Sequence, residues 1–584
     1  MSKGVSGNVF DINLLKRVLT YVLPYKGKFY FTGFLVVSLA FLAPIRPLLI
    51  QYAVDNFILV PNSVMLYNIT LVLIGLLILE SVLQFAQTYL ANWLGQSVVK
   101  DLRVDVYKKI NNFKLQYFDK TPIGTLVTRV VSDLETISDI FSQGILIIIG
   151  DILKLLAVVV FMLIQDWQLT LVMLLPMPIL FIATNWFKNY IKLAFQDVRT
   201  AISNLNTFVS EHLTGMSIVQ VFNRQEKELR SFKEINELHK QANIRTVWAN
   251  SIFFPVVEVL SAISLALLVW WGAGDVVAGK TTLGTLTAFI MYINMLYRPI
   301  RQLADKFNTL QMGMVASERV FKVLDTEASI DNKGNNKADN IQGEIEFKNL
   351  WFSYTDENWI LKGINFYSTP GQTIAFVGAT GAGKTSVINL LGRFYEYQKG
   401  EILIDGKDIR KYDLNALRSS LGVVLQDVFL FSDTIINNIS LRNPEITKTQ
   451  IIEASKKVGA HEFISKLPGG YQYNVKERGG MLSSGQRQLI AFIRAYVYNP
   501  QILILDEATS SVDSETERLI QKAIDILTKD RTSIIIAHRL ATIQKADNII
   551  VMEQGEIVEQ GSHNELIRRN GVYQNLFELQ FSNV

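Results

Sequence analysis

Six apolar stretches in the first 300 residues constrain the fold of this chain more than any other feature. They lie near residues 29–51, 68–92, 140–164, 167–187, 250–272 and 282–300. A helix needs about 20 consecutive apolar residues to cross a bilayer, and these stretches reach that length. The chain is 49% hydrophobic, and nearly all of the excess precedes residue 300. We therefore predict an α-helical domain of six membrane spans, followed by a domain of ordinary hydrophobicity.

The positions of the basic residues predict the orientation of these spans. The N-terminal segment carries Lys3, Lys16, Arg17, Lys26 and Lys28, and the long segments 93–139 and 188–249 are also rich in lysine and arginine. The short loops on the opposite side offer only Lys280. Because basic residues accumulate on the cytoplasmic side of a membrane, we expect both long segments, both termini and the C-terminal domain to be cytoplasmic. Residues 1–28 lack the continuous apolar run of a cleavable signal peptide.

Length and composition divide the chain and exclude several functions. A chain of 584 residues is too long for one core. A polar stretch rich in Asn and Gly at 326–340 reads as a linker, so we predict a membrane domain at 1–325 and a second domain at 341–584. The net charge of +4 is too small to indicate nucleic acid, and we expect no such partner. The absence of cysteine excludes disulfides, cysteine-ligated metals and thiol nucleophiles.

The second domain contains a loop that is suited to binding phosphate. Its residues are Gly378, Ala379, Thr380, Gly381, Ala382, Gly383, Lys384 and Thr385, and they fit the pattern G-x-x-x-x-G-K-[ST]. An apolar run at 374–377 predicts a buried strand before the loop, and residues 386–391, beginning with Ser386, predict a helix after it. Glycines let backbone N–H groups converge on phosphate oxygens at the start of that helix. Lys384 is expected to reach the β- and γ-phosphates, and the Thr385 hydroxyl to bind Mg²⁺.

A second signal for nucleotide chemistry follows about a hundred residues later. The apolar run Ile502–Leu505 predicts a buried strand that ends in Asp506 and Glu507. Parallel sheets present ligands at the carboxyl ends of their strands. We predict that Asp506 holds Mg²⁺, directly or through water, and that Glu507 polarises the water that attacks the γ-phosphate. Together with the phosphate loop and the alternation of strands and helices, this pair predicts an α/β ATPase domain.

Three further polar or aromatic residues are candidates for the same site. His538 follows the apolar strand 533–537 and is expected to contact the γ-phosphate, the alternative being an ordinary surface residue. Gln426 follows the strand 422–425 and could reach the Mg²⁺ or the attacking water. Tyr354 could stack on the base, or could simply favour a strand.

With these motifs in place, the last 245 residues resemble the nucleotide-binding domain of an ATP-binding cassette (ABC) transporter. Together with six spans they resemble an exporter half-transporter of the multidrug and lipid A family, over essentially the whole chain. The resemblance implies roles for matching residues. Tyr354 matches the adenine-stacking aromatic, 378–385 the Walker A loop, Gln426 the Q-loop, Asp506 the Walker B aspartate, Glu507 the catalytic glutamate, Ser510–Asp513 the D-loop and His538 the switch histidine.

The run Leu482–Gln486 resembles the family signature LSGGQ, except that Ser484 replaces the first glycine. In this family the signature closes over ATP that is held by the partner chain, so the resemblance implies a dimer. Ser483 and Gly485, placed to approach the γ-phosphate, are retained, as is Gln486. We expect a homodimer; the serine at 484 keeps open a heterodimer with a second, different half.

The resemblance also implies a function and a location. The expected function is ATP-driven export or flipping of an amphipathic or hydrophobic molecule, lipid-like or a drug, from the cytoplasmic side by alternating access. ATP and Mg²⁺ are the expected cofactors, membrane lipids and the substrate the expected partners, and a bacterial inner membrane the expected location. The alternatives are one half of a heterodimeric multidrug exporter and an ATP-gated channel. Residues 117–124 resemble the segment before the first cytoplasmic coupling helix, and 211–215 the start of the second such region.

Charged residues inside the predicted spans are expected to face protein or a wet cavity, because a charge at the bilayer centre costs about 2.5–3.5 kcal/mol on insertion scales. These residues are Arg46, Glu80, Asp151, Lys154 and Glu258. Asp151 and Lys154 lie three residues apart and are expected to neutralise each other. Arg46 has no charged neighbour in sequence, so it is a candidate for a substrate-facing cation or for a side chain that extends to the interface.

Overall fold

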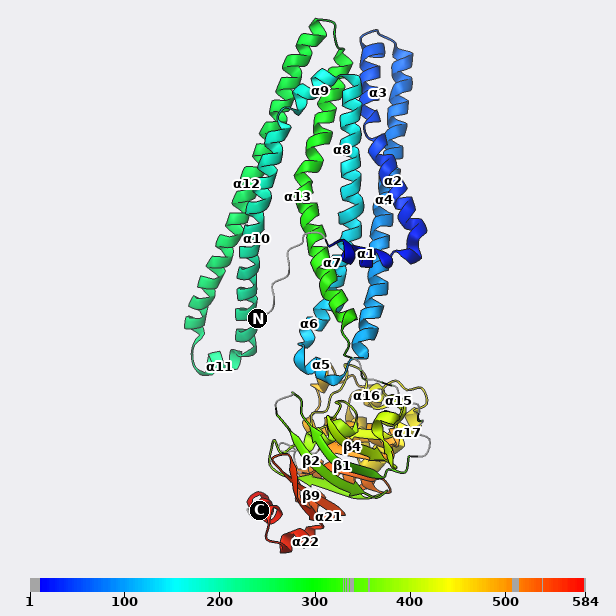
Figure 1. The fold of residues 1–584 in the computed structure, drawn as a ribbon, viewed down its shortest axis with the longest axis vertical. Helices are drawn as coiled ribbons and strands as arrows, with labels where there is room; N and C mark the ends of the chain where they lie inside the picture. The colour runs from blue at the N-terminus through cyan, green and yellow to red at the C-terminus, as the bar shows by residue number, and fades with distance from the viewer. Residues whose placement is uncertain are drawn as a thin grey trace. The chain divides into compact units, whose positions relative to one another are not determined.

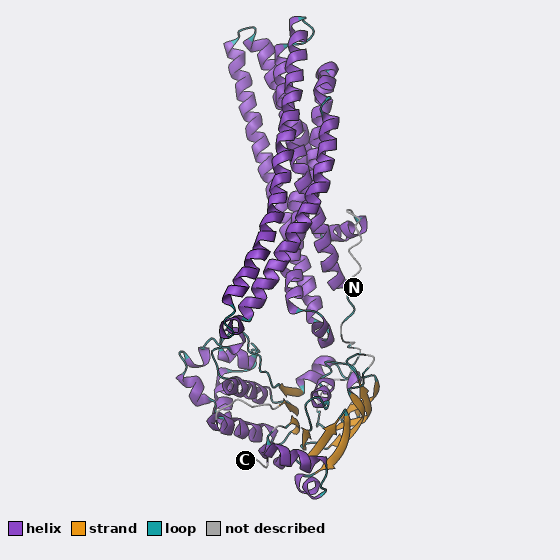
Figure 2. Cartoon of the chain, turned by 90° about the vertical axis from the view of Figure 1, so that its left-hand side faces the viewer, coloured by secondary structure: helices purple, strands orange, loops and turns teal. Residues whose placement is uncertain are grey.

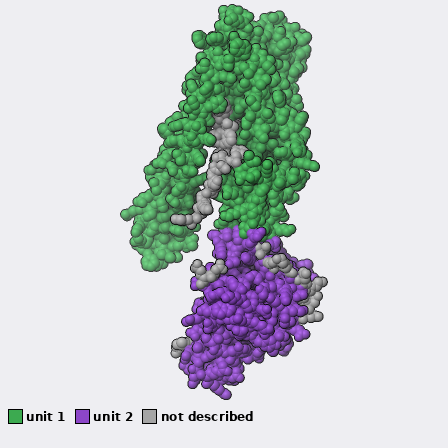
Figure 3. Space-filling model, in the orientation of Figure 1, with its two compact units in different colours: residues 1–111, 123–326 green, residues 112–122, 327–584 purple. Residues whose placement is uncertain are grey.

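The chain forms two compact units in a computed structural model (Figure 3). Unit 1 comprises Met1–Asn111 and Ile123–Thr326, and unit 2 comprises Asn112–Pro122 and Glu327–Val584. The structure describes residues 11–328, 330, 332, 334, 336, 341–355, 358–506, 514–537 and 539–581. The short segment 112–122 thus belongs to the same unit as the C-terminal domain, although it lies in the first long loop between predicted spans.

Unit 1 is helical throughout its described residues (Figures 1 and 2). Its α-helices are α1 (Ile12–Thr20), α2 (Lys26–Leu42), α3 (Ile45–Ala53), α4 (Ser63–Asn111), α6 (Ile123–Thr128), α7 (Leu134–Asp139), α8 (Ile145–Gln165), α9 (Trp167–Leu174), α10 (Met177–Thr214), α11 (Met216–Val221), α12 (Gln225–Val277) and α13 (Leu283–Asp325). Short 3₁₀ or π turns at Leu23–Tyr25, Val54–Ile58, Arg129–Asp133 and Ile140–Gly144 join some of them.

Five helical stretches among the described residues are long and apolar enough to cross a membrane. They are Leu23–Ile58, Ser63–Asn111, Ile123–Gln165, Trp167–Thr214 and Gln225–Val277. Five of the six predicted spans lie inside them. The sixth prediction, 282–300, falls at the start of α13, which is not among the five. The prediction of a helical membrane domain is confirmed, and the described residues contain five such stretches.

Two ion pairs join charged residues of the predicted spans to neighbouring helices of unit 1. Arg46 of α3 lies 3.7 Å from Glu80 of α4, a partner that its neighbours in sequence do not indicate. Asp151 of α8 forms an ion pair with Lys306 of α13, whereas the expected partner was Lys154 on its own helix. Sequence spacing reveals only partners on the same helix, whereas these partners come from helices that are adjacent in space.

Unit 2 is an α/β domain (Figure 1). Its strands are β1 (Ile345–Phe352), β2 (Leu361–Ser368), β3 (Thr373–Val377), β4 (Lys399–Ile404), β5 (Lys407–Asp408), β6 (Leu421–Val424), β7 (Ile502–Asp506), β8 (Thr532–Ile536), β9 (Asn548–Glu553) and β10 (Glu556–Gly561). Its α-helices are α5 (Leu115–Lys120), α14 (Lys384–Leu391), α15 (Leu414–Ser419), α16 (Ile435–Ser440), α17 (Lys448–Val458), α18 (His461–Lys466), α19 (Ser484–Tyr498), α20 (Ser514–Thr528), α21 (Leu540–Lys545), α22 (His563–Arg568) and α23 (Val572–Phe581).

The strands of unit 2 form two sheets. The larger has the order β10-β9-β3-β8-β7-β6, in which only β10 is antiparallel to its neighbour. The smaller is antiparallel, in the order β2-β1-β4-β5. Because side chains alternate between the faces of a strand, each central strand of the larger sheet contributes side chains to two hydrophobic cores.

The helices that carry the two nucleotide motifs pack on opposite faces of the larger sheet. Ile374 and Phe376 of β3 contribute to a hydrophobic core that also contains the apolar residues of α14 and the smaller sheet. Ala375 and Val377 face a separate core that contains the apolar residues of α19, α17 and α20. The phosphate-loop helix α14 and the signature helix α19 are therefore separated by the sheet.

Candidate nucleotide-binding site

The predicted phosphate loop joins β3 to the N-terminus of α14. Gly378 has φ +146° and Gly383 has φ +103°, a region that L-residues with a side chain rarely adopt. A Cβ atom on Gly378 would lie 2.2 Å from the carbonyl oxygen of Met552, so no side chain fits there. The two glycines thus bring the backbone close to neighbouring strands and expose the start of α14, where backbone N–H groups favour an anion.

Lys384 is folded back onto the loop that contains it. Its side chain is only 7% exposed, and Nζ donates hydrogen bonds to the carbonyl oxygens of Gly378 at 2.7 Å and Ala379 at 3.0 Å. Burial lowers the pKa of Lys384, and the Asp506 carboxylate opposes that shift. These bonds hold the loop in an ordered shape, and a phosphate group would compete with the two carbonyl oxygens for the same ammonium.

Asp506 lies at the carboxyl end of β7, as predicted, and is 8% exposed. Burial raises the pKa of its carboxyl group, Lys384 opposes this, and the nearby Asp427 adds to it. In the parallel register Val424 of β6 faces Leu505 of β7, so Gln426, two residues further on, is exposed at the same edge of the sheet. The fold therefore brings Lys384, Asp506 and Gln426 to one edge.

Tyr354, the predicted base-stacking residue, is anchored to the helix of the phosphate loop. Its hydroxyl lies 3.1 Å from the Ser386 hydroxyl and accepts a hydrogen bond from Asn389 Nδ2 at 3.3 Å. Its ring is half-buried and meets the ring of Phe352 edge-on, with centroids 4.7 Å apart. Tyr354 and Ser386 are thereby fixed relative to each other.

A segment remote in sequence contacts this tyrosine. Gln116 Nε2 of α5 donates to the Tyr354 carbonyl oxygen at 3.3 Å, and the Tyr395 hydroxyl donates to the Asp119 carboxylate. The rings of Tyr395 and Tyr354 are perpendicular, with centroids 4.9 Å apart. Burial, followed by the bond to Asp119, raises the pKa of Tyr395 well above its usual range. No local pattern indicates Tyr395, because its contact depends on a partner 276 residues away in sequence.

We expect Tyr395→Phe to loosen α5 from unit 2. The change removes the hydroxyl that donates to the carboxylate of the exposed residue Asp119, and a hydrogen bond to a charged group is worth about 1.5–3 kcal/mol. Amide hydrogen exchange of residues 112–122, measured by mass spectrometry, should therefore accelerate by about tenfold or more. Tyr412→Phe is the matched control, because its hydroxyl bonds the Ile404 carbonyl elsewhere in unit 2. Equal exchange in both variants would contradict the assignment.

The signature segment begins α19 with a capping box. The Ser483 hydroxyl accepts from the backbone N–H of Gln486 at 3.2 Å, and the Gln486 side chain accepts from the Ser483 N–H at 3.0 Å. Ser483 and Ser484 are exposed and Gly485 is buried. The serine in place of glycine is thus accommodated at the first position of a regular helix.

Three predicted elements lie outside the described residues. They are Glu507, the D-loop run Ser510–Asp513 and His538. The strand β7 ends at Asp506, directly before Glu507, and β8 ends at Ile536, two residues before His538.

The fold and the site define the class of protein: a nucleotide-binding α/β domain joined to a helical membrane domain. Comparison with known families agrees. The ABC transporter transmembrane region matches residues 29–300, and the ABC transporter domain matches residues 361–510. This chain belongs to the ABC transporter family and is an integral membrane protein with an ATP-hydrolysing domain.

The relatives below match most of the chain. The "Uncharacterized ABC transporter ATP-binding protein YknV" of Bacillus subtilis is 37% identical over 97% of this chain and 94% of its own length. The "ATP-dependent lipid A-core flippase" of Syntrophus aciditrophicus is 36% identical over 98% and 95%. The "Probable multidrug resistance ABC transporter ATP-binding/permease protein YheH" of Bacillus subtilis is 38% identical over 87% and 76%. The resemblance to a multidrug and lipid A exporter family is confirmed.

Proposed function

We propose that this protein is a half-transporter with six spans that uses ATP hydrolysis to export or flip an amphipathic or hydrophobic molecule out of the cytoplasmic side of a bacterial inner membrane. The observation that carries the proposal is the joining, in one chain, of a phosphate-loop domain to apolar helical stretches. The names of two relatives refer to multidrug resistance and to lipid A-core flipping. Both termini and the nucleotide domain would be cytoplasmic.

The residues near the phosphate loop are suited to the chemistry. Mg²⁺ prefers oxygen ligands and is usually held by one or two carboxylates together with substrate phosphates. The Thr385 hydroxyl and the buried Asp506 carboxylate provide such oxygens, with Gln426 at the same edge. When bound, the ion would neutralise charge on the phosphates. Lys384 would exchange the carbonyl oxygens of Gly378 and Ala379 for phosphate oxygens.

The remaining roles follow the family pattern. Glu507 would orient and polarise the attacking water, and His538 would contact the γ-phosphate. Tyr354 would stack on the adenine while its hydroxyl keeps its bond to Ser386. Ser483, Gly485 and Gln486 would approach ATP that is bound to the phosphate loop of a second chain.

We infer that the working unit is a dimer with ATP held between two nucleotide domains, and that the two chains are identical. Two observations support it. The helices α14 and α19 pack on opposite faces of the larger sheet, which leaves the signature of a chain away from its own phosphate-loop helix. In unit 1, α11 exposes Ile218 and Val221, and Val221 is 80% exposed. Phe222, directly after α11, is 70% exposed, so these residues form an apolar surface that a second chain could cover.

Cysteine crosslinking tests the dimer, and the absence of native cysteine makes it clean. In the double variant Thr380→Cys/Ser484→Cys, one thiol lies in the phosphate loop and one in the signature. We expect an ATP-dependent crosslink between chains in the purified protein, visible as a doubled mass on a non-reducing gel. The pair Thr380→Cys/Val558→Cys, whose second thiol lies on β10, is the control. No crosslink and no ATPase activity in the protein alone would favour a heterodimer with an unlike half.

A transport assay tests the export function. The protein is reconstituted into vesicles with a fluorescent lipid or a hydrophobic dye, and ATP-dependent movement between leaflets is measured. Conductance in a planar bilayer distinguishes the channel alternative, because an ATP-gated channel would pass ions when ATP is bound and an exporter would not.

A further inference from the structure

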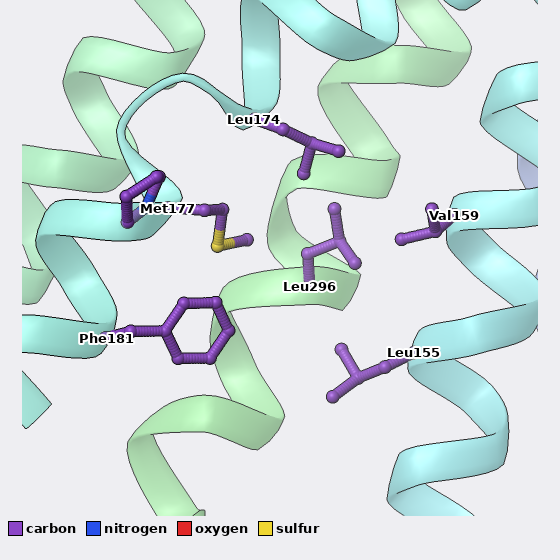
Figure 4. A pocket seen from close by; sticks show the side chains of 7 residues that line it. Leu155, Val159, Leu174, Met177, Phe181 and Leu296 are labelled. Carbon is purple, nitrogen blue, oxygen red and sulfur yellow. The ribbon is translucent and has the colours of Figure 1, made fainter. Parts of the chain in front are cut away.

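The membrane unit contains a pocket next to a break between two helices. Helix α9 ends at Leu174 and α10 begins at Met177. Pro176 and Pro178 both lack a backbone N–H and cannot donate to carbonyl groups one turn earlier. The chain therefore turns at 175–176 instead of continuing as one helix, and the pocket lies beside this turn (Figure 4).

The pocket has a volume of about 350 Å³, within the range of roughly 300–1,000 Å³ that is usual for small-molecule sites. Helix α8 contributes Leu155 and Val159, the α9–α10 region contributes Leu174, Met177, Pro178 and Phe181, and α13 contributes Leu296. None of these seven side chains carries a hydrogen-bonding group. In Figure 4 the side chains from α8 face those from α10 across the pocket, with Leu296 between them.

The pocket reaches from an open mouth to the core of unit 1. Leu296 is 2% exposed and, like Met177, belongs to a hydrophobic core that is shared by α8, α9, α10, α12 and α13. Phe181 is 62% exposed. An apolar group of a bound molecule could therefore enter from the Phe181 side and contact the core.

Charged groups lie at one end of the same helix face. Asp151 precedes Leu155 by four residues and Val159 by eight, so the three share one face of α8. Asp151 is about 6 Å from Leu155 along the helix axis. Its partner Lys306 comes from α13, the helix that also contributes Leu296. The pocket is thus apolar along its walls and has an ion pair beyond one end.

We propose that this pocket holds one hydrocarbon chain of an amphiphile, whose polar head lies toward the Asp151–Lys306 pair. An apolar cavity without hydrogen-bonding groups does not hold water, and the apolar matter available inside a bilayer is mainly acyl chain. The walls offer a polar drug nothing to bond and a fused-ring drug only the Phe181 ring to stack on. The hydrocarbon chain could belong to the exported molecule, and that assignment rests on the proposed function. It could also belong to a lipid of the surrounding bilayer.

Photo-crosslinking of the full-length protein in nanodiscs tests the site. The probe is lysophosphatidylglycerol with a diazirine in its acyl chain, and labelled peptides are identified by mass spectrometry. We expect labels on the pocket-lining parts of α8, α10 and α13. Leu155→Trp, which obstructs the pocket, should reduce that labelling by about tenfold, since overpacking carries a penalty of that order. Leu163→Trp makes the same change on α8 outside the pocket lining and should label like the parent protein.

The possible outcomes distinguish the two sources of the hydrocarbon chain and show what result would overturn the proposal. Labelling that falls during ATP turnover assigns the hydrocarbon chain to the exported molecule, and labelling that persists assigns it to a resident lipid. Labelling that Leu155→Trp leaves unchanged, or that spreads equally over the outer face of α8, overturns the proposal. Val159→Phe is a second obstructing variant in case Leu155→Trp does not fold. Binding is read without ATP, so it remains measurable even if no export is found.

Discussion

Lys384→Ala should abolish most ATP binding and hydrolysis. The change removes the only lysine in the phosphate loop, and removing one donor that stabilises transition-state charge costs about 10²–10³ in turnover. Affinity should fall by about tenfold or more as well, because a hydrogen bond to a charged group contributes about 1.5–3 kcal/mol in the ground state. Equilibrium binding of a fluorescent ATP analogue and steady-state phosphate release measure the two effects.

The expected loss has a second cause in the structure. Lys384 Nζ also bonds the carbonyl oxygens of Gly378 and Ala379, so its removal leaves the loop less ordered before any nucleotide arrives. Lys545→Ala is the control, since this exposed lysine pairs with Asp525 on the surface of unit 2. An affinity of Lys384→Ala within a factor of about two of the parent would contradict the placement of the loop in the site.

Glu507→Gln should leave ATP binding nearly intact and lower turnover by orders of magnitude. A general base contributes about 10²–10⁴ to the rate, and its effect is confined to the transition state, so only the rate should change. The contrast with Lys384→Ala is diagnostic, because the lysine acts in both binding and hydrolysis. Single-turnover hydrolysis alongside equilibrium binding separates the two cases.

A matched substitution elsewhere in unit 2 serves as a control for a general loss of fold. Glu453→Gln makes the same change on α17 of unit 2, and its ATPase activity should equal that of the parent. If Glu507→Gln kept more than about a tenth of the parent turnover, the role of Glu507 as general base would be rejected, since that contribution is at least about 10².

Much of the nucleotide domain could be predicted from sequence because its signals are local. The predicted strand 374–377 corresponds to β3 (Thr373–Val377), and the strand 502–505 to β7 (Ile502–Asp506). The predicted helix 386–391 lies within α14, which begins two residues earlier at Lys384. Glycine spacing and apolar runs determine such elements directly, so the residues themselves carry the information.

Contacts between distant segments could not be predicted in this way. Nothing near Asp119 indicates Tyr395, and nothing near Asp151 indicates Lys306, because each pair is brought together only by the packing of whole helices. The neighbours that sequence did suggest, such as Lys154 for Asp151, are neighbours along one helix. Arg46 seemed isolated for the same reason, since Glu80 lies on another helix.

The assignment of residues 112–122 to unit 2 has a consequence for how the chain folds during synthesis. Pro122 leaves the ribosome about 200 residues before Glu327, where the rest of that unit begins. At about 5–20 residues per second, this interval lasts roughly 10–40 s. During it, α5 has no Tyr354 carbonyl and no Tyr395 hydroxyl to bond, and Phe113, which is buried in the final structure, lacks its complete surroundings. Helices of unit 1 can assemble in that time, whereas the nucleotide domain becomes complete only when its late-made part meets a segment made long before.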